Sequence, residues 1–113
     1  MYKQMELFQR EFDPIEKYAK LGTRISGGKE RIKDFFEHNK NLSERINFVK
    51  KEYGTSGFGS PERKPNTIFR ADANSKGHKF SYCDENMSEI CMHITHKQVV
   101  SAISDLIERG EYI

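Results

Sequence analysis

The sequence has no apolar run near the ~20 residues that a helix needs to cross a bilayer. Its start, MYKQMELFQREF, carries charges throughout and does not look like a signal peptide. We therefore expect an intracellular, cytoplasmic protein that does not associate with membranes. The only cysteines are Cys83 and Cys91. Two are too few for a disulfide scaffold, and in a reducing compartment both are expected to be free thiols.

Catalytic signatures are also missing. The sequence has no nucleophile elbow, no HExxH motif and no His/Cys pair with an orienting acid in a recognisable setting. Asp72, Asp84, Glu85 and Glu89 fall in or beside predicted turns, where acidic residues usually serve solubility rather than hold Mg²⁺. Because no active-site role is filled, we predict that the protein is not an enzyme and has no cofactor. A metal-dependent enzyme is the less favoured alternative.

The composition favours a folded domain with an uneven distribution of charge. The chain has 113 residues, which suits one modest core, and its aromatic content of 12% argues against disorder. Its net charge of +2 is too small to indicate nucleic-acid binding by itself. Residues 50–79 hold seven Lys/Arg against three Asp/Glu, whereas residues 80–113 hold two against six. A basic middle segment and an acidic C-terminal segment therefore offset each other in the total.

Helical signals dominate the first half of the chain. Apolar residues at helical spacing predict a first helix near residues 2–12. Asp13 then caps a second helix, which starts at Pro14 and is expected to stop at Gly22, because glycine commonly ends helices. Two further helices are predicted within residues 29–53, with their charged faces in solvent and their apolar faces inside.

The apolar period changes from 3.6 to 2 in the second half. A short strand is expected at residues 67–71, followed by turn chemistry in DANSKG. Residues 78–83 and 90–94 then predict a β-hairpin whose core-facing side chains are Phe80, Tyr82, Ile90, Met92 and Ile94. The sequence from Thr95 to Gln98 is a capping box for a last helix, which Gly110 ends.

These elements predict an α+β fold, with N-terminal helices, a small antiparallel hairpin or three-stranded sheet, and a packed C-terminal helix. We expect residues 1–113 to form a single domain. Within it, residues 1–27 are predicted to be an N-terminal helical extension and residues 28–113 the core module.

The stretch YGTSGFGSPERKP, residues 53–65, places three glycines ahead of two basic residues. A phosphate-binding loop needs a strand before it, a helix after it and Lys-Ser/Thr after its last glycine, and none of these is predicted. Turn conformations explain the glycines structurally. The alternative is a binding loop whose basic residues contact phosphate oxygens, while an aromatic ring stacks on a base, wedges into a partner or folds back onto the core. The candidate partner or nucleic-acid contacts are Phe58, Arg63, Lys64, Arg70, Lys76 and Lys79.

Cysteine and histidine gather near the hairpin. Cys83, Cys91 and His93 are expected on one strand face, where they offer zinc three ligands at most without strain. Structural zinc sites prefer cysteines two to four residues apart, whereas seven residues separate Cys83 from Cys91. We therefore favour half-buried thiols and surface histidines, and predict no metal.

Three segments carry a longer pattern: FVKKEYGTSGFG, DANSKGHKFSY and ITHKQVVSAISDLIERGEYI. The pattern is a helix that ends in a Tyr-Gly turn, a short Lys-Gly hairpin, and a last helix that closes in LI..G.Y. It resembles a small module of large proteins from Firmicute phages, plasmids and conjugative elements, where it lies beside helicase-like and DNA-methylase-like domains. The matching positions are Tyr53, Gly54, Gly57, Lys76, Gly77, Leu106, Ile107, Gly110 and Tyr112.

The resemblance covers residues 43–113, with weaker support from residue 28, and it implies a mobile-element setting close to nucleic acid. It implies no catalytic role. Phe58 departs from the pattern, which usually has His or Ser there, and we expect this chain to be a free-standing copy. A free-standing copy suggests an inhibitor of a host defence nuclease, of the anti-CRISPR or anti-restriction type, with the nuclease or another nucleoprotein complex as its partner. The alternative is an accessory or regulatory protein of the element that binds double-stranded DNA.

Overall fold

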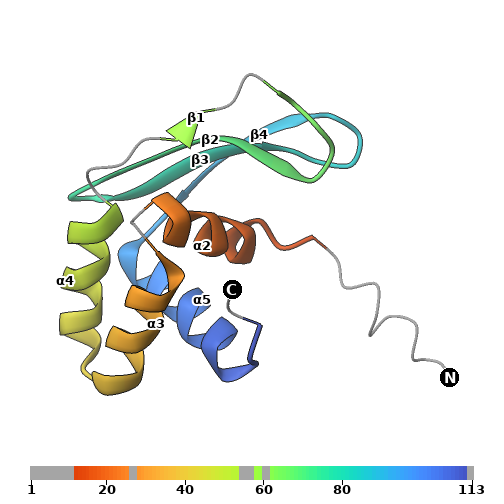
Figure 1. Ribbon diagram of the computed structural model, residues 1–113. Helices are drawn as coiled ribbons and strands as arrows, with labels where there is room; N and C mark the ends of the chain where they lie inside the picture. Colours follow the sequence, from red (N-terminus) through yellow and green to blue (C-terminus); the bar gives the residue numbers. More distant parts are fainter. Residues whose placement is uncertain (1–11, 26–27, 54–57, 60–61, 112–113) are drawn as a thin grey trace, which may run out of the picture.

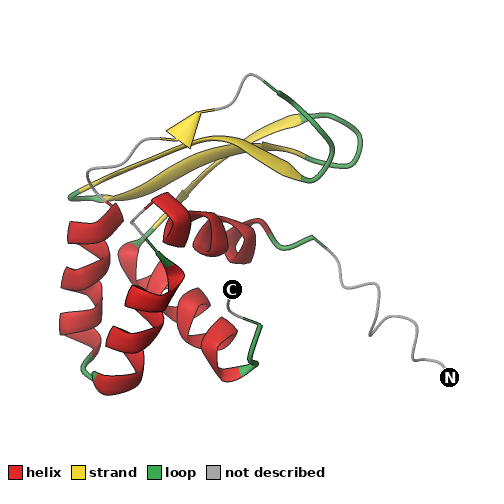
Figure 2. Cartoon of the chain, in the orientation of Figure 1, coloured by secondary structure: helices red, strands yellow, loops and turns green. Residues whose placement is uncertain are grey.

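The computed structural model describes residues 12–25, 28–53, 58–59 and 62–111, with only the backbone described at residues 24, 25, 58 and 59. The helix predicted near residues 2–12 lies outside this range except for its last residue, Phe12, which is not helical. In the described part, an antiparallel sheet packs one face against a group of helices, and no helix covers its other face (Figure 1; Figure 2). The predicted α+β class, with a helix after the strands, is confirmed. None of the described helices is long and apolar enough to cross a membrane.

Helices α2 (Pro14–Ile25), α3 (Lys29–His38) and α4 (Leu42–Tyr53) precede the long strands. The start of α2 agrees with the sequence analysis. Oδ1 of Asp13 accepts hydrogen bonds from the N–H groups of Ile15 at 3.0 Å and Glu16 at 3.3 Å, which satisfies two donors of the first turn.

The predicted end of this helix is wrong, because α2 continues through Gly22 to Ile25. The reason lies in another helix. A Cβ atom at Gly22 would lie 2.1 Å from Cε2 of Tyr53, at the end of α4. Gly22 therefore serves the close packing of α2 against the Tyr53 ring rather than helix termination.

The sheet has the order β1-β2-β3-β4, and every neighbouring pair is antiparallel. Its long strands are β2 (Thr67–Asn74), β3 (Gly77–Cys83) and β4 (Glu89–Ile94), and the two-residue β1 (Phe58–Gly59) adds an edge. Strand β2 runs further than the sequence predicted, to Asn74. The turn to β3 is correspondingly short.

The helices cover the sheet unevenly. Phe80 lies opposite Ala71 on β2 and Met92 on β4, and Phe80 and Ile94 are buried as predicted. Ile90 was also predicted to face the core, but it is 36% exposed. The loop end of the β3–β4 hairpin extends beyond the helices (Figure 1). Apolar side chains at this end therefore have no described helix to pack against, even where they alternate as core residues do.

One hydrophobic cluster joins the helices to the sheet. It contains Tyr18 and Ala19 of α2, Phe36 of α3 and Phe80 of β3. The described part of the predicted N-terminal extension therefore packs within the same core as the module that follows it.

Helix α5 (His96–Glu108) begins and ends as the sequence predicts. The side chain of Thr95 accepts from the N–H of Gln98 at 3.1 Å, and the N–H of Thr95 donates to Oε1 of Gln98 at 2.8 Å. At the other end, Gly110 has a φ of 68°, and its N–H donates to the carbonyl of Ile107 at 3.1 Å. These bonds satisfy terminal backbone groups that the helix itself cannot pair.

Candidate functional site

The face of the sheet that no described helix covers is the candidate site, and we call it the outer face. Side chains alternate between the two faces of a strand, so the partners of the core residues define it. The register places nine residues there: Thr67, Arg70, Asp72, Lys79, Ser81, Cys83, Glu89, Cys91 and His93.

Three of the predicted contact residues come together on this side of the molecule. Arg70 lies opposite Ser81, and Asp72 lies opposite Lys79, so Arg70 and Lys79 are diagonal neighbours at about 7–8 Å. Lys76 lies in the turn that joins the same two strands. Arg70, Lys76 and Lys79 are all exposed, and none of them forms an ion pair with another described residue.

An open hollow of about 480 Å³ lies at this end of the sheet. Its lining includes Lys76, Lys79 and His93, together with the carboxylate of Asp72. The lysines and the imidazole can donate hydrogen bonds to an anionic group such as a carboxylate or a phosphate. The carboxylate of Asp72 repels any further negative charge beside it. The hollow therefore suits a partner that carries both positive and negative groups.

Arg63 belongs to a different contact on the outer face. Its Nε donates to Oε2 of Glu89 at 2.8 Å, and its guanidinium lies 4.3 Å from the ring centre of Phe69. Phe69 sits at the irregularity in the β2–β3 register and is buried beneath this group. Arg63 therefore packs over the sheet with its charge partly compensated, and its role as a partner contact stays a prediction.

The remaining predicted contacts are placed only in part. Lys64 is exposed, and its Nζ lies 3.5 Å from Oε1 of Glu62. Phe58 pairs with Ala71 through the backbone of β1, but its side chain lies outside the described part, as do Gly54 and Gly57. A stacking role for Phe58 also stays a prediction.

The structure contains a buried polar chain that the sequence analysis missed. The hydroxyl of Tyr18 lies 2.7 Å from Nδ1 of His78, and Nε2 of His78 lies 2.9 Å from Nδ1 of His96. The three residues come from α2, β3 and α5, and all are at least 95% buried. Nε2 of His96 has no hydrogen-bond partner among the described residues. The chain thus links three elements through the core at the cost of one unsatisfied buried atom.

Burial keeps Tyr18 and His78 uncharged at neutral pH. Desolvation, and then the neighbouring His96, lower the pKa of His78 to about 4. Burial, and then the charge of Asp72, raise the pKa of Tyr18 above its ordinary value. With a neutral imidazole, His78 donates from one ring nitrogen and accepts at the other, so the two hydrogen bonds can run in either direction. The arrangement is a structural joint in which both ring nitrogens of His78 are paired, while Nε2 of His96 is not.

The cysteines and histidines do not gather into a metal site. Among the described residues, no group of three His, Cys, Asp or Glu side chains is placed to hold a metal ion. Cys83 is buried, whereas Cys91 and His93 are exposed. The expectation of surface histidines is wrong for His78 and His96, because both lie in the core.

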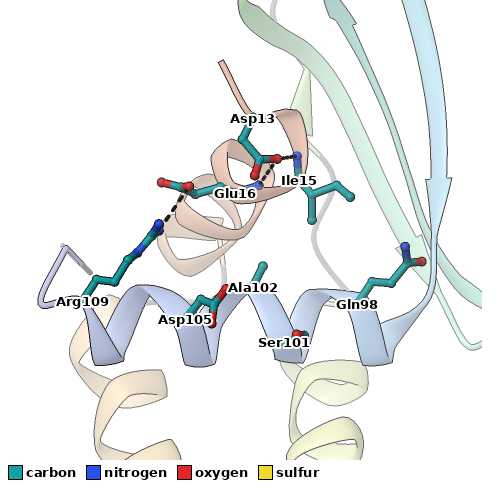
Figure 3. A pocket seen from close by; sticks show the side chains of 8 residues that line it. All are labelled: Asp13, Ile15, Glu16, Gln98, Ser101, Ala102, Asp105 and Arg109. Carbon is teal, nitrogen blue, oxygen red and sulfur yellow. Dashed lines mark hydrogen bonds and ion pairs between the residues drawn. The ribbon is translucent and has the colours of Figure 1, made fainter. Parts of the chain in front are cut away.

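A second hollow, of about 260 Å³, lies between the start of α2 and the outer side of α5 (Figure 3). The guanidinium of Arg109 lies 3.2 Å from Oε1 of Glu16, and Asp13 is occupied with the helix cap. The hydrogen bond to Glu16 raises the pKa of Arg109. This hollow is a joint between two helices, and Asp13, Glu16 and Arg109 in its lining already serve the fold.

Comparison of the chain with protein-family models, with curated proteins and with solved structures gives no match. The fold and the outer face are therefore known from the structure, while the resemblance to a mobile-element module stays an expectation.

Proposed function

We propose that this chain is a non-enzymatic binding protein of a mobile genetic element, acting in the cytoplasm on a nucleic-acid-processing complex. The observation that carries the proposal is the outer face, which none of the described helices covers. There Arg70 and Lys79 are exposed beside Lys76 and form no ion pair with another described residue. Exposed charges of this kind commonly guide association and fix the orientation of a protein partner. The mobile-element setting rests on the resemblance of the segments around Tyr53 and Lys76.

The mixed charge of the outer face favours a protein partner over bare DNA. Asp72 lies directly opposite Lys79, and Glu89 compensates Arg63. A phosphate backbone is attracted by the basic groups but repelled by both carboxylates, whereas a protein surface can match both signs. We therefore favour an inhibitor of a host defence nuclease, of the anti-CRISPR or anti-restriction type, that works by covering part of the nuclease.

Direct binding of double-stranded DNA is the second candidate function. It is favoured by the open hollow, where Lys76, Lys79 and His93 can reach phosphate oxygens. Each phosphate that a lysine neutralises releases a counterion, so contacts by Lys76 and Lys79 predict that log K falls with log salt with a slope of about −2. A protein partner held by few charges predicts a much weaker dependence on salt.

A pull-down of the tagged protein from host lysate, with and without nuclease treatment, separates the two candidates. Recovery of a defined nuclease or restriction subunit after nuclease treatment, identified by mass spectrometry, supports the inhibitor. Recovery of nucleic acid and its usual binding proteins, lost on nuclease treatment, contradicts the inhibitor and supports the DNA-binding accessory protein.

A further inference from the structure

From the open edge of the sheet we infer that this protein forms a symmetric dimer, in which β4 pairs antiparallel with β4 of a second copy. The strand order β1-β2-β3-β4 gives β4 a strand neighbour on one side only. On the other side, no described segment pairs with it. The opposite edge of the sheet is the two-residue β1, which is too short to template a partner strand.

A hydrogen bond in the β3–β4 loop shows which backbone groups of β4 point away from β3. The N–H of Asp84 donates to the carbonyl of Ser88 at 3.0 Å, which puts these two residues at a hydrogen-bonded position of the ladder, although the N–H of Ser88 donates to Oδ1 of Asp84 instead of its carbonyl. Hydrogen-bonded and non-hydrogen-bonded pairs alternate along an antiparallel ladder. Following this alternation along the β3–β4 register, the N–H and C=O groups of Glu89, Cys91 and His93 point away from β3.

A second β4 matches these groups in one favoured register. Outward-pointing residues must lie opposite outward-pointing residues, and only a register centred on Cys91 uses all three of them. It places Glu89 opposite His93 of the second copy, where the imidazole can donate to the carboxylate. On the other face it places Ile90 opposite Met92 of the second copy. One oxygen of Glu89 already accepts from Arg63, and the other is available to this imidazole. The strand is therefore complementary to itself in hydrogen bonding and in apolar contact.

The edge lacks the usual features that prevent such pairing. Natural edge strands are commonly blunted by lysine, proline, a bulge or very short length. Strand β4 has the sequence EICMHI, without lysine or proline, and its register with β3 has no irregularity. Ile90 is 36% exposed on this strand, and Met87 is 47% exposed in the loop before it. Pairing with a second copy covers part of this apolar surface.

The dimer has a consequence for the outer face. The two-fold axis passes between the two copies of Cys91 and runs perpendicular to the sheet, so both outer faces lie on the same side of one continuous sheet. The Arg70 and Lys79 side chains of both copies then face a common partner.

Sedimentation velocity of the whole chain under reducing conditions, over a range of concentrations, tests the dimer. We expect a reversible monomer–dimer equilibrium. The thiols of Cys91 in the two copies lie on the same face in this register, so a short bismaleimide should link two chains covalently. Cys91→Ser should abolish the link and leave the dimer, because Cys83 is buried.

Charge variants identify the interface. His93→Glu places two carboxylates opposite each other at both ends of the paired strands, and should weaken the dimer roughly tenfold. Combining it with Glu89→Lys should restore much of the affinity. His93 is exposed, so an unchanged circular-dichroism melt will show that the variant is folded. A chain that stays monomeric, or a dimer with unchanged affinity in His93→Glu and no Cys91 link, overturns the inference.

Discussion

The hydroxyl of Tyr18 on α2 lies 2.7 Å from Nδ1 of His78 on β3, sixty positions further along the chain. The Tyr18 ring also stacks on Phe80, with ring centres 4.8 Å apart. Through His78 the contact continues to His96 at the start of α5. One buried aromatic residue therefore fixes the position of the sheet relative to the helices, and with it the position of the outer face.

Stability should depend on pH through His78. Its pKa is lowered from 6.5 to about 4 in the folded protein, so the unfolded chain takes up a proton that the folded chain resists. This contribution is fully present above pH 6.5 and is lost as the pH falls towards 4. The free energy of unfolding should drop by about 2 kcal/mol between pH 7 and pH 5. Urea denaturation at a series of pH values measures this.

Two variants test whether His78 is the source of the pH effect. His78→Gln should remove most of the slope between pH 7 and pH 5, although it also lowers stability overall. His93→Gln, at an exposed histidine of the neighbouring strand, should keep the slope. Equal slopes in wild type and His78→Gln would show that another group is responsible.

Tyr18→Phe should destabilise the protein by about 1–3 kcal/mol. The change keeps the ring on Phe80 but leaves Nδ1 of His78 buried without its partner. Tyr82→Phe is the matched control, because Tyr82 is only partly buried and its hydroxyl has no hydrogen bond with a described residue. In thermal melts, the melting temperature should fall clearly more in Tyr18→Phe than in Tyr82→Phe. A fall in Tyr18→Phe no larger than that in Tyr82→Phe would contradict a stabilising role for the hydrogen bonds from Tyr18 through His78 to His96.

Gly22→Ala should destabilise the protein, although alanine is the better helix former by about 1 kcal/mol. The added Cβ would lie 2.1 Å from the Tyr53 ring, and that ring is fixed by a bond from its hydroxyl to the carbonyl of Ala19 at 3.1 Å. Overpacking of this kind costs about 1–3 kcal/mol and so exceeds the gain in propensity. In a Tyr53→Ala background the same change should become stabilising, and chemical denaturation of the four chains reports the reversal of sign.

Arg45→Lys should lower the free energy of unfolding by about 2 kcal/mol, although the substitution keeps the positive charge. The guanidinium donates to the carbonyls of Asn39 and Phe36 and to Oγ of Ser104, and so ties α4 to the end of α3 and to α5. A lysine ammonium lacks the planar fork that reaches all three acceptors. Arg31→Lys is the control, because Arg31 is exposed and makes a single hydrogen-bonded ion pair, with Glu52, which a lysine ammonium can also form. This variant should lose less than about 1 kcal/mol. Similar losses of stability in Arg45→Lys and Arg31→Lys would show that the hydrogen bonds of Arg45 do not tie the three helices together.

Local rules predict the parts of the fold whose causes lie close in sequence. The cap at Asp13, the capping box from Thr95 to Gln98 and the ending at Gly110 each depend on neighbours within a few positions. The alternation around Phe80 likewise predicts a strand with a buried face.

Residues whose role depends on distant partners escape this reasoning. Gly22 matches a helix end, and only the Tyr53 ring, thirty-one positions away, reveals its packing role. Arg45 looks like one more charge on a solvated helix until α3 and α5 are placed beside it. His78 shares the phase of Phe80, which was a signal of its burial, whereas nothing local indicates the burial of His96.

The candidate site, too, could be predicted from the sequence only in part. Charge counting identified the basic segment, but strand register decides that Arg70 and Lys79 become neighbours while Arg63 is held by Glu89. Register depends on the bulge near Phe69 and on the length of the turn after Asn74, and neither follows from composition.

The most direct test of the account is a quantitative pull-down with the double variant Arg70→Glu/Lys79→Glu. The control is Lys40→Glu/Lys50→Glu, which makes the same change of charge at exposed positions on the helical side. After nuclease treatment, the outer-face variant should retain at least about tenfold less of the partner than wild type, with an unchanged melting temperature, since several charge pairs across an interface change sign. The control should bind like wild type. Full retention by the folded outer-face variant would show that the outer face of the sheet is not the binding surface.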